Sequence, residues 1–519
     1  MTEESKYYLK FSTMLKGVKM NWKISMTLPV IAMMLLYGCA SSNDLFRAPT
    51  VGIPYGSQVP ILVKGISQGK VRIEYRKTVD PFVSFSEWGQ LSDKNSLTTN
   101  LFLKDLDAGT DYTYRIEFED ESYSKWFKFK TFPEQGKAGK FNFIFSSCVR
   151  EKYLGYNVFG QIEQLSPSFV ALLGDQMYAD YDGDVNKIEL HRTNDSLRQA
   201  IVKKGEVILN DKTVLQAFRN KYNRVFDTNF QNMASSIPLA AIWDDHDFGK
   251  DNSDSTYRYK EEAKKVFKEN YPDYSFIQKD RGIYYKFSIA DVDIFVLDTR
   301  WYRSPMQTED GGWKTMLGDE QLEWLLKELK NSKAVLKIVL SSVSFNDYGG
   351  DTSSDRVGYD NWSGYKFERH KILSFINEND INGVVVFSGD QHYPSAHILN
   401  WKKPLSPISR TDNSTEYSLS DIGPVVFDFS ASPLSYKIAT GDTLKIDNQK
   451  NPQYSFEIFR PVWAMPDKVK KDDNIVITSV FGIAEIDTES IPVKISVRFF
   501  ELDSKTSAMV EIYKTTVTY

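Results

Sequence analysis

Residues 239–247 of this 519-residue chain read Leu-Ala-Ala-Ile-Trp-Asp-Asp-His-Asp, a short apolar run that ends in three acids and a histidine. Four further runs of strand length also pass from apolar to polar residues at their carboxyl ends, at 141–145, 169–173, 292–297 and 383–387. Runs this apolar predict strands that are covered on both faces, so we expect an α/β fold with helices flanking the sheet. Apolar spacing of three to four residues predicts helices at 261–271 and 319–329.

The residues that follow these five runs are the candidates for chemistry. They include Cys148, Gly174-Asp175-x-x-Tyr178, Asp244-Asp245-His246-Asp247 with Asn252, Asp298-x-Arg300-x-x-Arg303, and Gly389-Asp390-x-His392. Because ligand sites in α/β folds lie off the carboxyl ends of strands, we expect these groups to meet in one place. Carboxylates gathered there raise one another's pKa unless cations neutralise them. The supply of Asp, His, Asn, Tyr and Cys ligands exceeds the need of one ion, which predicts a two-metal site.

The composition narrows the class of protein. Hydrophobic residues make up 41% and charged residues 26%, which excludes a disordered, collagen-like or polytopic membrane chain. The net charge of −5 gives no basic excess, so we expect no nucleic-acid partner. The chain has two cysteines, Cys39 and Cys148, which excludes a disulfide-rich scaffold.

The first forty residues have the layout of an export signal. Three lysines precede an apolar stretch at 24–36, which is too short to span a bilayer comfortably and ends in Leu36-Tyr37-Gly38-Cys39. This ending resembles the lipobox of bacterial lipoproteins, although Tyr37 departs from the usual pattern. The resemblance implies a signal peptide at 1–38, lipidation of Cys39, a tether at 39–50, and an exported protein anchored to a membrane of the bacterial cell envelope. An ordinary cleaved signal or a membrane anchor is the alternative.

Residues 51–135 predict a separate all-β domain. Alternating apolar residues mark strands at 70–77 and 110–118. Residues 103–115 resemble the L-x-x-L-x-x-G-T-x-Y-x-Y-R stretch of fibronectin type III sandwiches. We therefore expect a fibronectin-like β-sandwich with a structural or substrate-side role, followed by a catalytic domain at 136–519.

The second domain carries a further resemblance. Gly174-Asp175-x-x-Tyr178, Asp245-His246 and Gly389-Asp390-x-His392 resemble the calcineurin-like metallophosphoesterase pattern. With the Ser-Cys at the first strand, the Trp-Asp-Asp-His-Asp block and the Leu-Asp-Thr-Arg block, they resemble the PhoD-type alkaline phosphatase family over roughly residues 50–515. The resemblance implies a sandwich of β-sheets flanked by helices, and hydrolysis of phosphate mono- or diesters.

The same resemblance implies roles for single residues. Ferric iron would be held by Cys148, Asp175, Tyr178 and His392. Calcium would be held by Asp175 as the bridge, Asn252 and Asp390, with Asp245 close by. A hydroxide bridging the metals would attack phosphorus, His246 would act as a general acid or charge stabiliser, and Arg300 and Arg303 would bind phosphate oxygens.

Plainer interpretations remain open at this stage. Cys148 and Tyr178 could be core residues, and Asn252 could cap the helix that follows. Asp298, Arg300 and Arg303 could form a buried ion-pair network. Two other functions also fit: a non-catalytic surface-binding lipoprotein on the same fold, and a binuclear hydrolase of another ester. Against the first of these, every expected ligand position is filled.

Overall fold

The computed structural model describes residues 45–180, 211–346, 360–400, 405–420, 422–437, 458–465, 477–503, 506 and 508–519. The predicted signal peptide, the lipidation candidate Cys39 and the first part of the predicted tether lie outside these residues. Residues 45–519 form one compact unit. Among the helices that the structure describes, none has the length and apolar character needed to cross a bilayer.

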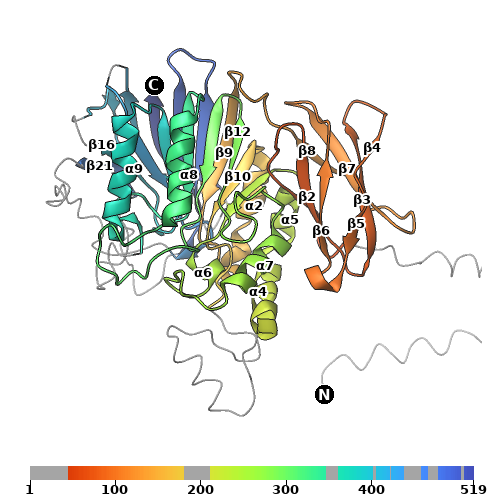
Figure 1. Ribbon diagram of the computed structural model, residues 1–519. Helices are drawn as coiled ribbons and strands as arrows, with labels where there is room; N and C mark the ends of the chain where they lie inside the picture. Colours follow the sequence, from red (N-terminus) through yellow and green to blue (C-terminus); the bar gives the residue numbers. More distant parts are fainter. Residues whose placement is uncertain are drawn as a thin grey trace, which may run out of the picture. The chain divides into compact units, whose positions relative to one another are not determined.

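Two large sheets form the body of this unit (Figure 1). The eight-stranded sheet runs in the order β11 (Leu239–Ile242), β10 (Phe169–Leu173), β9 (Lys140–Ser146), β23 (Val480–Asp487), β24 (Lys494–Leu502), β25 (Met509–Thr518), β18 (Ser414–Ser418), β17 (Ser409–Arg410). The seven-stranded sheet runs in the order β12 (Tyr285–Ile289), β13 (Val292–Val296), β14 (Leu336–Ser341), β15 (Val384–Ser388), β19 (Val426–Ser430), β16 (Ser395–Asn400), β21 (Ile458–Ala464). All five predicted apolar strands are present, but three lie in the first sheet and two in the second.

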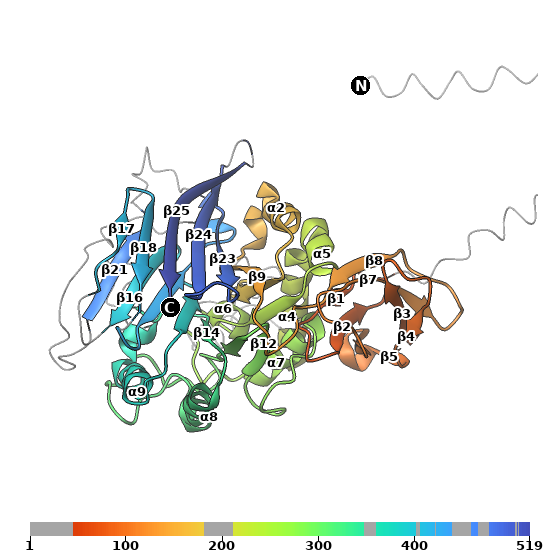
Figure 2. The same cartoon turned by 90° about the horizontal axis from the view of Figure 1, so that it is seen from above.

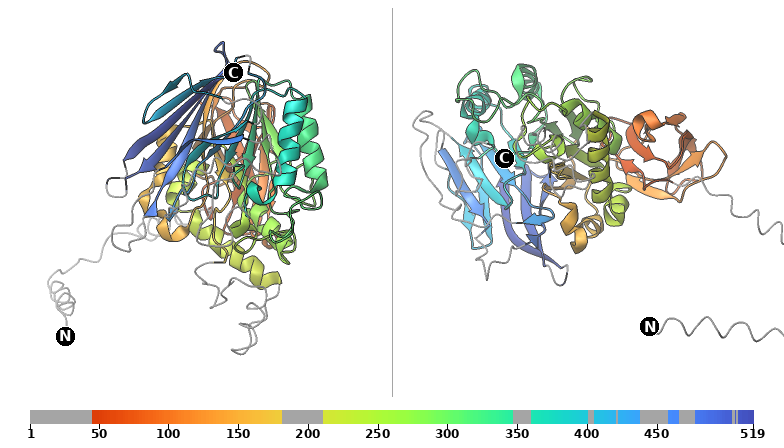
Figure 3. Two further views of the ribbon diagram at one scale, coloured as in Figure 1. Left: turned by 90° about the vertical axis from the view of Figure 1, so that its left-hand side faces the viewer. Right: turned by 90° about the horizontal axis from the view of Figure 1, so that it is seen from below.

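The two sheets pack face to face through aromatic side chains. Phe143 and Phe145 of β9 meet Phe387 of β15 with ring centroids 4.9 and 4.8 Å apart. Because β9, β10 and β11 are parallel to one another, and so are β13, β14 and β15, the carboxyl ends within each set lie at one edge of their sheet. Figures 2 and 3 show the sheets as adjacent layers.

Helices cover the outer faces. The two predicted helices are confirmed as α7 (Lys260–Asn270) and α8 (Gly318–Asn331). The apolar stripe of α8 packs with α9 (Lys366–Glu378) on strands β13 to β15. The described residues also form the helices α2 (Val158–Leu165), α4 (Asp211–Val225), α5 (Thr228–Ala234) and α6 (Asp245–Phe248), with short 3-10 turns at Asp93–Asn95, Glu151–Tyr156 and Trp362–Gly364. A small ladder joins β20 (Tyr436–Lys437) to β22 (Ile477–Thr478).

An N-terminal β unit precedes this body. One sheet holds β1 (Thr50–Val51), β2 (Val59–Lys64) and β6 (Thr98–Leu103), and the other holds β3 (Gly69–Lys77), β4 (Ser84–Phe85), β5 (Gly89–Leu91), β7 (Asp111–Phe118) and β8 (Phe127–Lys130). Apolar residues of both sheets share one core. The two-sheet arrangement agrees with the expected β-sandwich, whereas the fibronectin type III assignment and the boundary at 135 stay predictions.

The last part of the predicted tether is docked on the body. Arg47 is buried and donates to the side-chain and backbone oxygens of Asn270 in α7, at 3.0 and 3.2 Å. Its guanidinium also lies 3.9 Å from the ring centroid of Phe226. Residues 45–50 therefore belong to the packed structure, because a buried arginine with these contacts holds the segment in place.

Candidate metal centre

Side chains that follow β9, β10, β11 and β15 meet at one end of the two sheets. Ligand atoms of Cys148, Asp175 and His392 all lie within 4.8 Å of one another. The same holds for Asp175 with Asp245 and His246, and for Asp175 with Asp244 and Asp390. Asp175 belongs to all three groups, so it stands between the groups contributed by the two sheets.

The backbone at this junction is unusual. Five of the predicted ligands are non-glycine residues in the left-handed region: Cys148 (φ 62°), Asp175 (53°), Asn252 (60°), Asp390 (68°) and His392 (60°). This conformation is uncommon for residues with a side chain, and such strain gathers at functional sites. The turns after four different elements are thus bent to bring these side chains together.

Glycines before two of the aspartates allow the close approach. A Cβ on Gly174 would lie 2.4 Å from the Cβ of Asp244, and Gly174 itself has a φ of +91°. A Cβ on Gly389 would lie 2.5 Å from the hydroxyl oxygen of Ser147. The Ser147 hydroxyl also accepts a hydrogen bond from the backbone N–H of Asp390 at 2.9 Å. The Gly-Asp pairs of the sequence are therefore required by packing between turns.

Burial and mutual repulsion shift the pKa values of the acids in this cluster. Burial raises the pKa of Asp175 well above its usual value, and Asp245 and Asp244 add to the shift. Burial and the neighbouring charge of Asp244 likewise raise the pKa of Asp390. Burial, and then the charge of Asp175, raise the pKa of the Cys148 thiol, whose sulfur lies 3.7 Å from Asp175 Oδ2. A cation held among these groups would reverse each of these shifts, so the donor set fits a metal.

Asp245 differs from its neighbours. Although burial opposes it, His246 and Arg300 hold the pKa of Asp245 below its usual value. Asp245 Oδ2 accepts the backbone N–H of Asn252 at 2.5 Å. This contact places Asn252 beside the acids, and the helix that follows begins only at Lys260, so Asn252 is not its cap.

His246 is held by an acid that the sequence analysis did not select. Its Nδ1 lies 2.6 Å from Asp180 Oδ1, and its ring lies against Tyr178 with centroids 4.3 Å apart. Asp180 Oδ2 in turn accepts the backbone N–H of Asp251 at 2.9 Å. Although burial opposes it, Asp180 and then Asp245 raise the pKa of His246. The only signal for Asp180 in the sequence was its place two residues after Tyr178.

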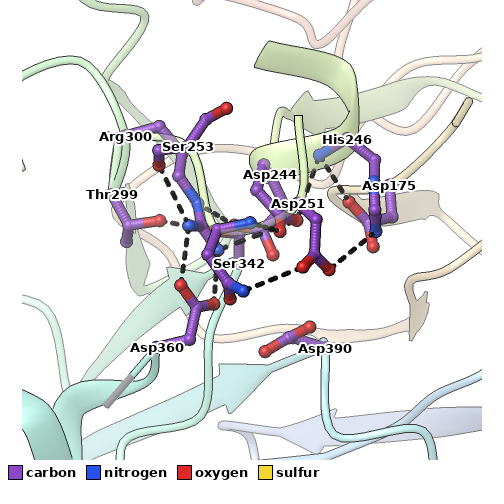
Figure 4. A network of polar contacts seen from close by, with 12 residues as sticks. Asp175, Asp244, His246, Asp251, Ser253, Thr299, Arg300, Ser342, Asp360 and Asp390 are labelled. Atoms are coloured by element: carbon purple, nitrogen blue, oxygen red, sulfur yellow. Dashed lines mark hydrogen bonds and ion pairs between the residues drawn. The ribbon is translucent and has the colours of Figure 1, made fainter. Parts of the chain in front are cut away.

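Arg300 lies at the centre of a buried ion-pair network (Figure 4). Its Nε donates to Asp244 Oδ1 at 2.6 Å, and its two terminal nitrogens donate to the two oxygens of Asp360 at 3.1 and 2.9 Å. Arg300 is fully buried, and these contacts are those of the ion-pair alternative. Arg303 Nη2 lies 3.3 Å from Asp360 as well. No motif surrounds Asp360, so nothing in the sequence pointed to it.

Two further aspartates hold the turns. Asp247 Oδ1 accepts the backbone N–H groups of Gln176 and Met177 at 3.0 and 3.2 Å, which fixes the turn after Asp175. Asp298 accepts the indole N–H of Trp243 at 2.8 Å and the backbone N–H of Arg300 at 2.9 Å. Both acids therefore position other residues of the site.

Comparisons with known proteins agree with this fold and site. A family model described as PhoD-like phosphatase matches residues 143–462, more than half of the chain. Alkaline phosphatase D of Bacillus subtilis (strain 168) is 26% identical over 324 residues, which cover 57% of this chain and 53% of that protein. The match thus spans about half the length of that relative.

Two solved structures share the fold. One, described as the structure of PhoD, has a TM-score of 0.61 at 19% identity, covering 91% of this chain and 92% of that chain. Purple acid phosphatase PPD1 from yellow lupin (Lupinus luteus) seeds has a TM-score of 0.53 at 11% identity, covering 91% and 74%. These likenesses confirm the predicted class of fold, a sandwich of β-sheets flanked by helices.

Proposed function

Because this chain belongs to the PhoD-like phosphatase family, we propose that it is a metal-dependent phosphoesterase, an alkaline phosphatase or phosphodiesterase. Catalysis would take place at the candidate metal centre. The observation that carries the proposal is the position of Asp175. Its ligand atoms lie within 4.8 Å of those of Cys148 and His392 on one side, and of those of acids from two other turns, Asp244 and Asp245 after β11 and Asp390 after β15, on the other. One carboxylate between two donor sets is what a binuclear centre needs.

We assign the two donor sets to different ions. Cys148, Asp175, Tyr178 and His392 would hold ferric iron, and Asp175, Asn252 and Asp390, with Asp245 close by, would hold calcium. A phenolate, a thiolate and an imidazole suit a transition metal, whereas the second set offers the oxygen atoms that calcium prefers. Bound cations supply positive charge for phosphate oxygens and make a water acidic enough to attack phosphorus.

His246 and Arg300 would have separate tasks. Asp180 holds the His246 ring through Nδ1, and Nε2 would donate a proton to the leaving oxygen or stabilise its charge. Arg300 would act as a positioning residue, because its guanidinium is occupied by Asp244 and Asp360. Removal of His246 would therefore slow turnover through loss of a proton donor or charge stabiliser, whereas removal of Arg300 would do so by displacing the acids that it holds.

Export and anchoring complete the proposal. The basic flank, the apolar stretch at 24–36 and the residues around Cys39 support a lipid-anchored protein of the bacterial cell envelope. Its substrates would then be phosphate esters that reach the envelope.

The test is turnover and metal content of the purified protein supplied with iron and calcium. Mono- and bis-(p-nitrophenyl) phosphate and p-nitrophenyl acetate are assayed side by side. Asp175→Asn should reduce phosphate ester hydrolysis by more than about 100-fold and release metal, with an unchanged circular dichroism spectrum. The exposed acid Asp319 serves as the matched control, and Asp319→Asn should behave like the parent.

The alternatives make different predictions in the same assay. A protein that binds no metal and cleaves none of the esters would be the non-catalytic binder, and cleavage of the acetate alone would indicate another hydrolase. Iron bound by a tyrosinate colours a protein. Tyr178→Phe should therefore remove the visible band of the iron-loaded protein, and Cys148→Ser should shift it.

A further inference from the structure

A short pattern occurs twice in the N-terminal β unit. Residues 84–88 read Ser-Phe-Ser-Glu-Trp and residues 122–126 read Ser-Tyr-Ser-Lys-Trp. Arg-Ile-Glu also occurs twice, at 72–74 in β3 and at 115–117 in β7. These two strands pair antiparallel with the central isoleucines opposite each other, so each arginine faces the other strand's glutamate. The two copies are thus related by a local two-fold arrangement.

Both copies dock on the sheet in the same way. The Ser86 hydroxyl accepts the backbone N–H of Ile73 at 2.9 Å and donates to Glu87 O at 2.9 Å. The Ser124 hydroxyl accepts the backbone N–H of Ile116 at 2.9 Å and donates to Lys125 O at 2.9 Å. Equivalent hydrogen bonds at equivalent positions thus attach the two segments to β3 and β7.

The rings of both copies enclose arginines. The Arg72 guanidinium carbon lies 4.3 Å from the ring centroid of Phe85 and 4.7 Å from that of Trp88. The second copy repeats this, with Arg115 at 3.8 Å from Tyr123 and 4.6 Å from Trp126. We call these four rings and two arginines the aromatic ladder. The rings remain 40–43% exposed although they are held in place, so their surface is available without an ordering cost.

The charges of the aromatic ladder are already neutralised. Arg72 forms two hydrogen bonds to Glu117, at 2.8 and 2.9 Å. Arg115 forms two to Glu74, at 3.0 and 2.7 Å. The Arg76 guanidinium carbon also lies 5.1 Å from the ring centroid of Trp126. A polyanion would nevertheless gain little from the two arginines that are paired in this way, and we take the complementary occupant to carry no net charge.

We propose that the aromatic ladder binds a neutral polysaccharide. The face of an aromatic ring is electron-rich, and the C–H groups on the face of a sugar ring are its positive complement. The guanidinium and carboxylate edges offer donors and acceptors for hydroxyl groups beside each ring. Two equivalent sets of two rings and one arginine suit a polymer of repeating units better than a single small ligand. Tryptophan, tyrosine and arginine are also the residues that dominate binding energy at interfaces.

The test is affinity electrophoresis of the purified protein in native gels that contain laminarin, dextran or hydroxyethyl cellulose, together with sedimentation on insoluble chitin. We expect at least one glycan to retard or sediment the parent protein. Trp88→Ala and Trp126→Ala should each weaken that binding at least about tenfold, and the double variant should abolish it. All variants should keep the parent turnover of mono-(p-nitrophenyl) phosphate, since the aromatic ladder is separate from the metal centre.

Trp313 provides the matched control, because it is 69% exposed and lies outside the N-terminal β unit. Trp313→Ala should bind glycan like the parent protein. Trp88→Leu and Trp126→Leu keep apolar bulk if alanine destabilises the sheet, and they should also lose binding. No binding to any of these glycans, or binding that both tryptophan variants retain, overturns the proposal. Concentration-dependent dimerisation that Trp88→Ala abolishes would assign the surface to a second copy instead.

Discussion

At the scale of the residue, Arg300 is the group on which the buried acids depend most directly. Its guanidinium reaches Asp244, Asp360 and, at 3.8 Å, Asp245. From the sequence, Arg300 with Asp298 and Arg303 was expected either in a buried ion-pair network or as a phosphate ligand. The deciding partner, Asp360, stands in no motif, and only folding brings it to Arg300.

Replacing this arginine should therefore destabilise the fold. Arg300→Gln removes the guanidinium from Asp244 and Asp245 and leaves Asp360 with Arg303 alone, and we expect the free energy of unfolding to fall by roughly 3–5 kcal/mol. Urea denaturation of the purified protein measures the change. Arg498→Gln is the control, since Arg498 pairs with Glu485 and Glu511 near the surface and should cost less than about 1 kcal/mol. Equal losses in both variants would contradict the network.

Lys64 gives a residue-scale prediction about pH. Burial, and then the charge of Arg47, lower the pKa of Lys64 to about 7, and its Nζ donates to Asn223 at 3.1 Å. Between pH 7 and the usual pKa of lysine the unfolded chain holds the extra proton, so stability rises with pH in this range. Relative to Lys64→Met, the parent should gain about 2 kcal/mol of unfolding free energy between pH 6.5 and pH 9. A constant difference between the two proteins would refute the lowered pKa.

At the scale of the element, the strands were predictable and their grouping was not. The apolar run Phe169–Leu173 is buried along its whole length, so its sequence correctly predicted a strand that is covered on both faces. It does not say which sheet the strand joins, because an apolar run looks the same in either sheet. The convergence of strand ends was expected from one sheet, yet it arises from two sheets that face each other. The five-residue pattern repeated at 84–88 and 122–126 could not be interpreted from the sequence, because its meaning appears only where both segments dock on the paired strands β3 and β7.

Gly174 tests the packing between two of these strand ends. Gly174→Ala places a Cβ against Asp244 in a backbone that disfavours side chains, so we expect a loss of about 2–4 kcal/mol of stability together with reduced turnover. Gly423 has a similar φ of +89°, and no described atom lies within 4 Å of the point that its Cβ would take. Gly423→Ala should therefore show the backbone cost alone, about 1 kcal/mol, with parent turnover. Equal effects of the two variants would mean that the contact with Asp244 is unimportant.

At the scale of the whole molecule, the candidate metal centre takes side chains from both sheets. Cys148 and Asp175 come from the eight-stranded sheet, whereas Asp390 and His392 follow a strand of the seven-stranded sheet. Cations between them would bind the folded form and not the unfolded one, so they would stabilise the sandwich as a whole.

Removal of metal should therefore lower the stability of the whole folded unit as well as its activity. Dialysis against a chelator should abolish phosphate ester hydrolysis and lower the thermal midpoint by roughly 5 °C, and adding iron and calcium should restore both. Asp175→Asn, which lacks the shared ligand, should show a smaller shift on chelation. A chelated parent with an unchanged midpoint would show that the ions do not hold the sheets together.

The docked Arg47, near the start of the compact unit, limits how far the proposed enzyme could extend from its proposed lipid anchor. Arg47 fixes its segment to α7, so only residues 40–44 separate the proposed lipid from Leu45. Six residue steps extend at most about 20 Å. In an anchored molecule Leu45 would thus stay within about 20 Å of the bilayer, and esters released far from the membrane would have to diffuse to the enzyme.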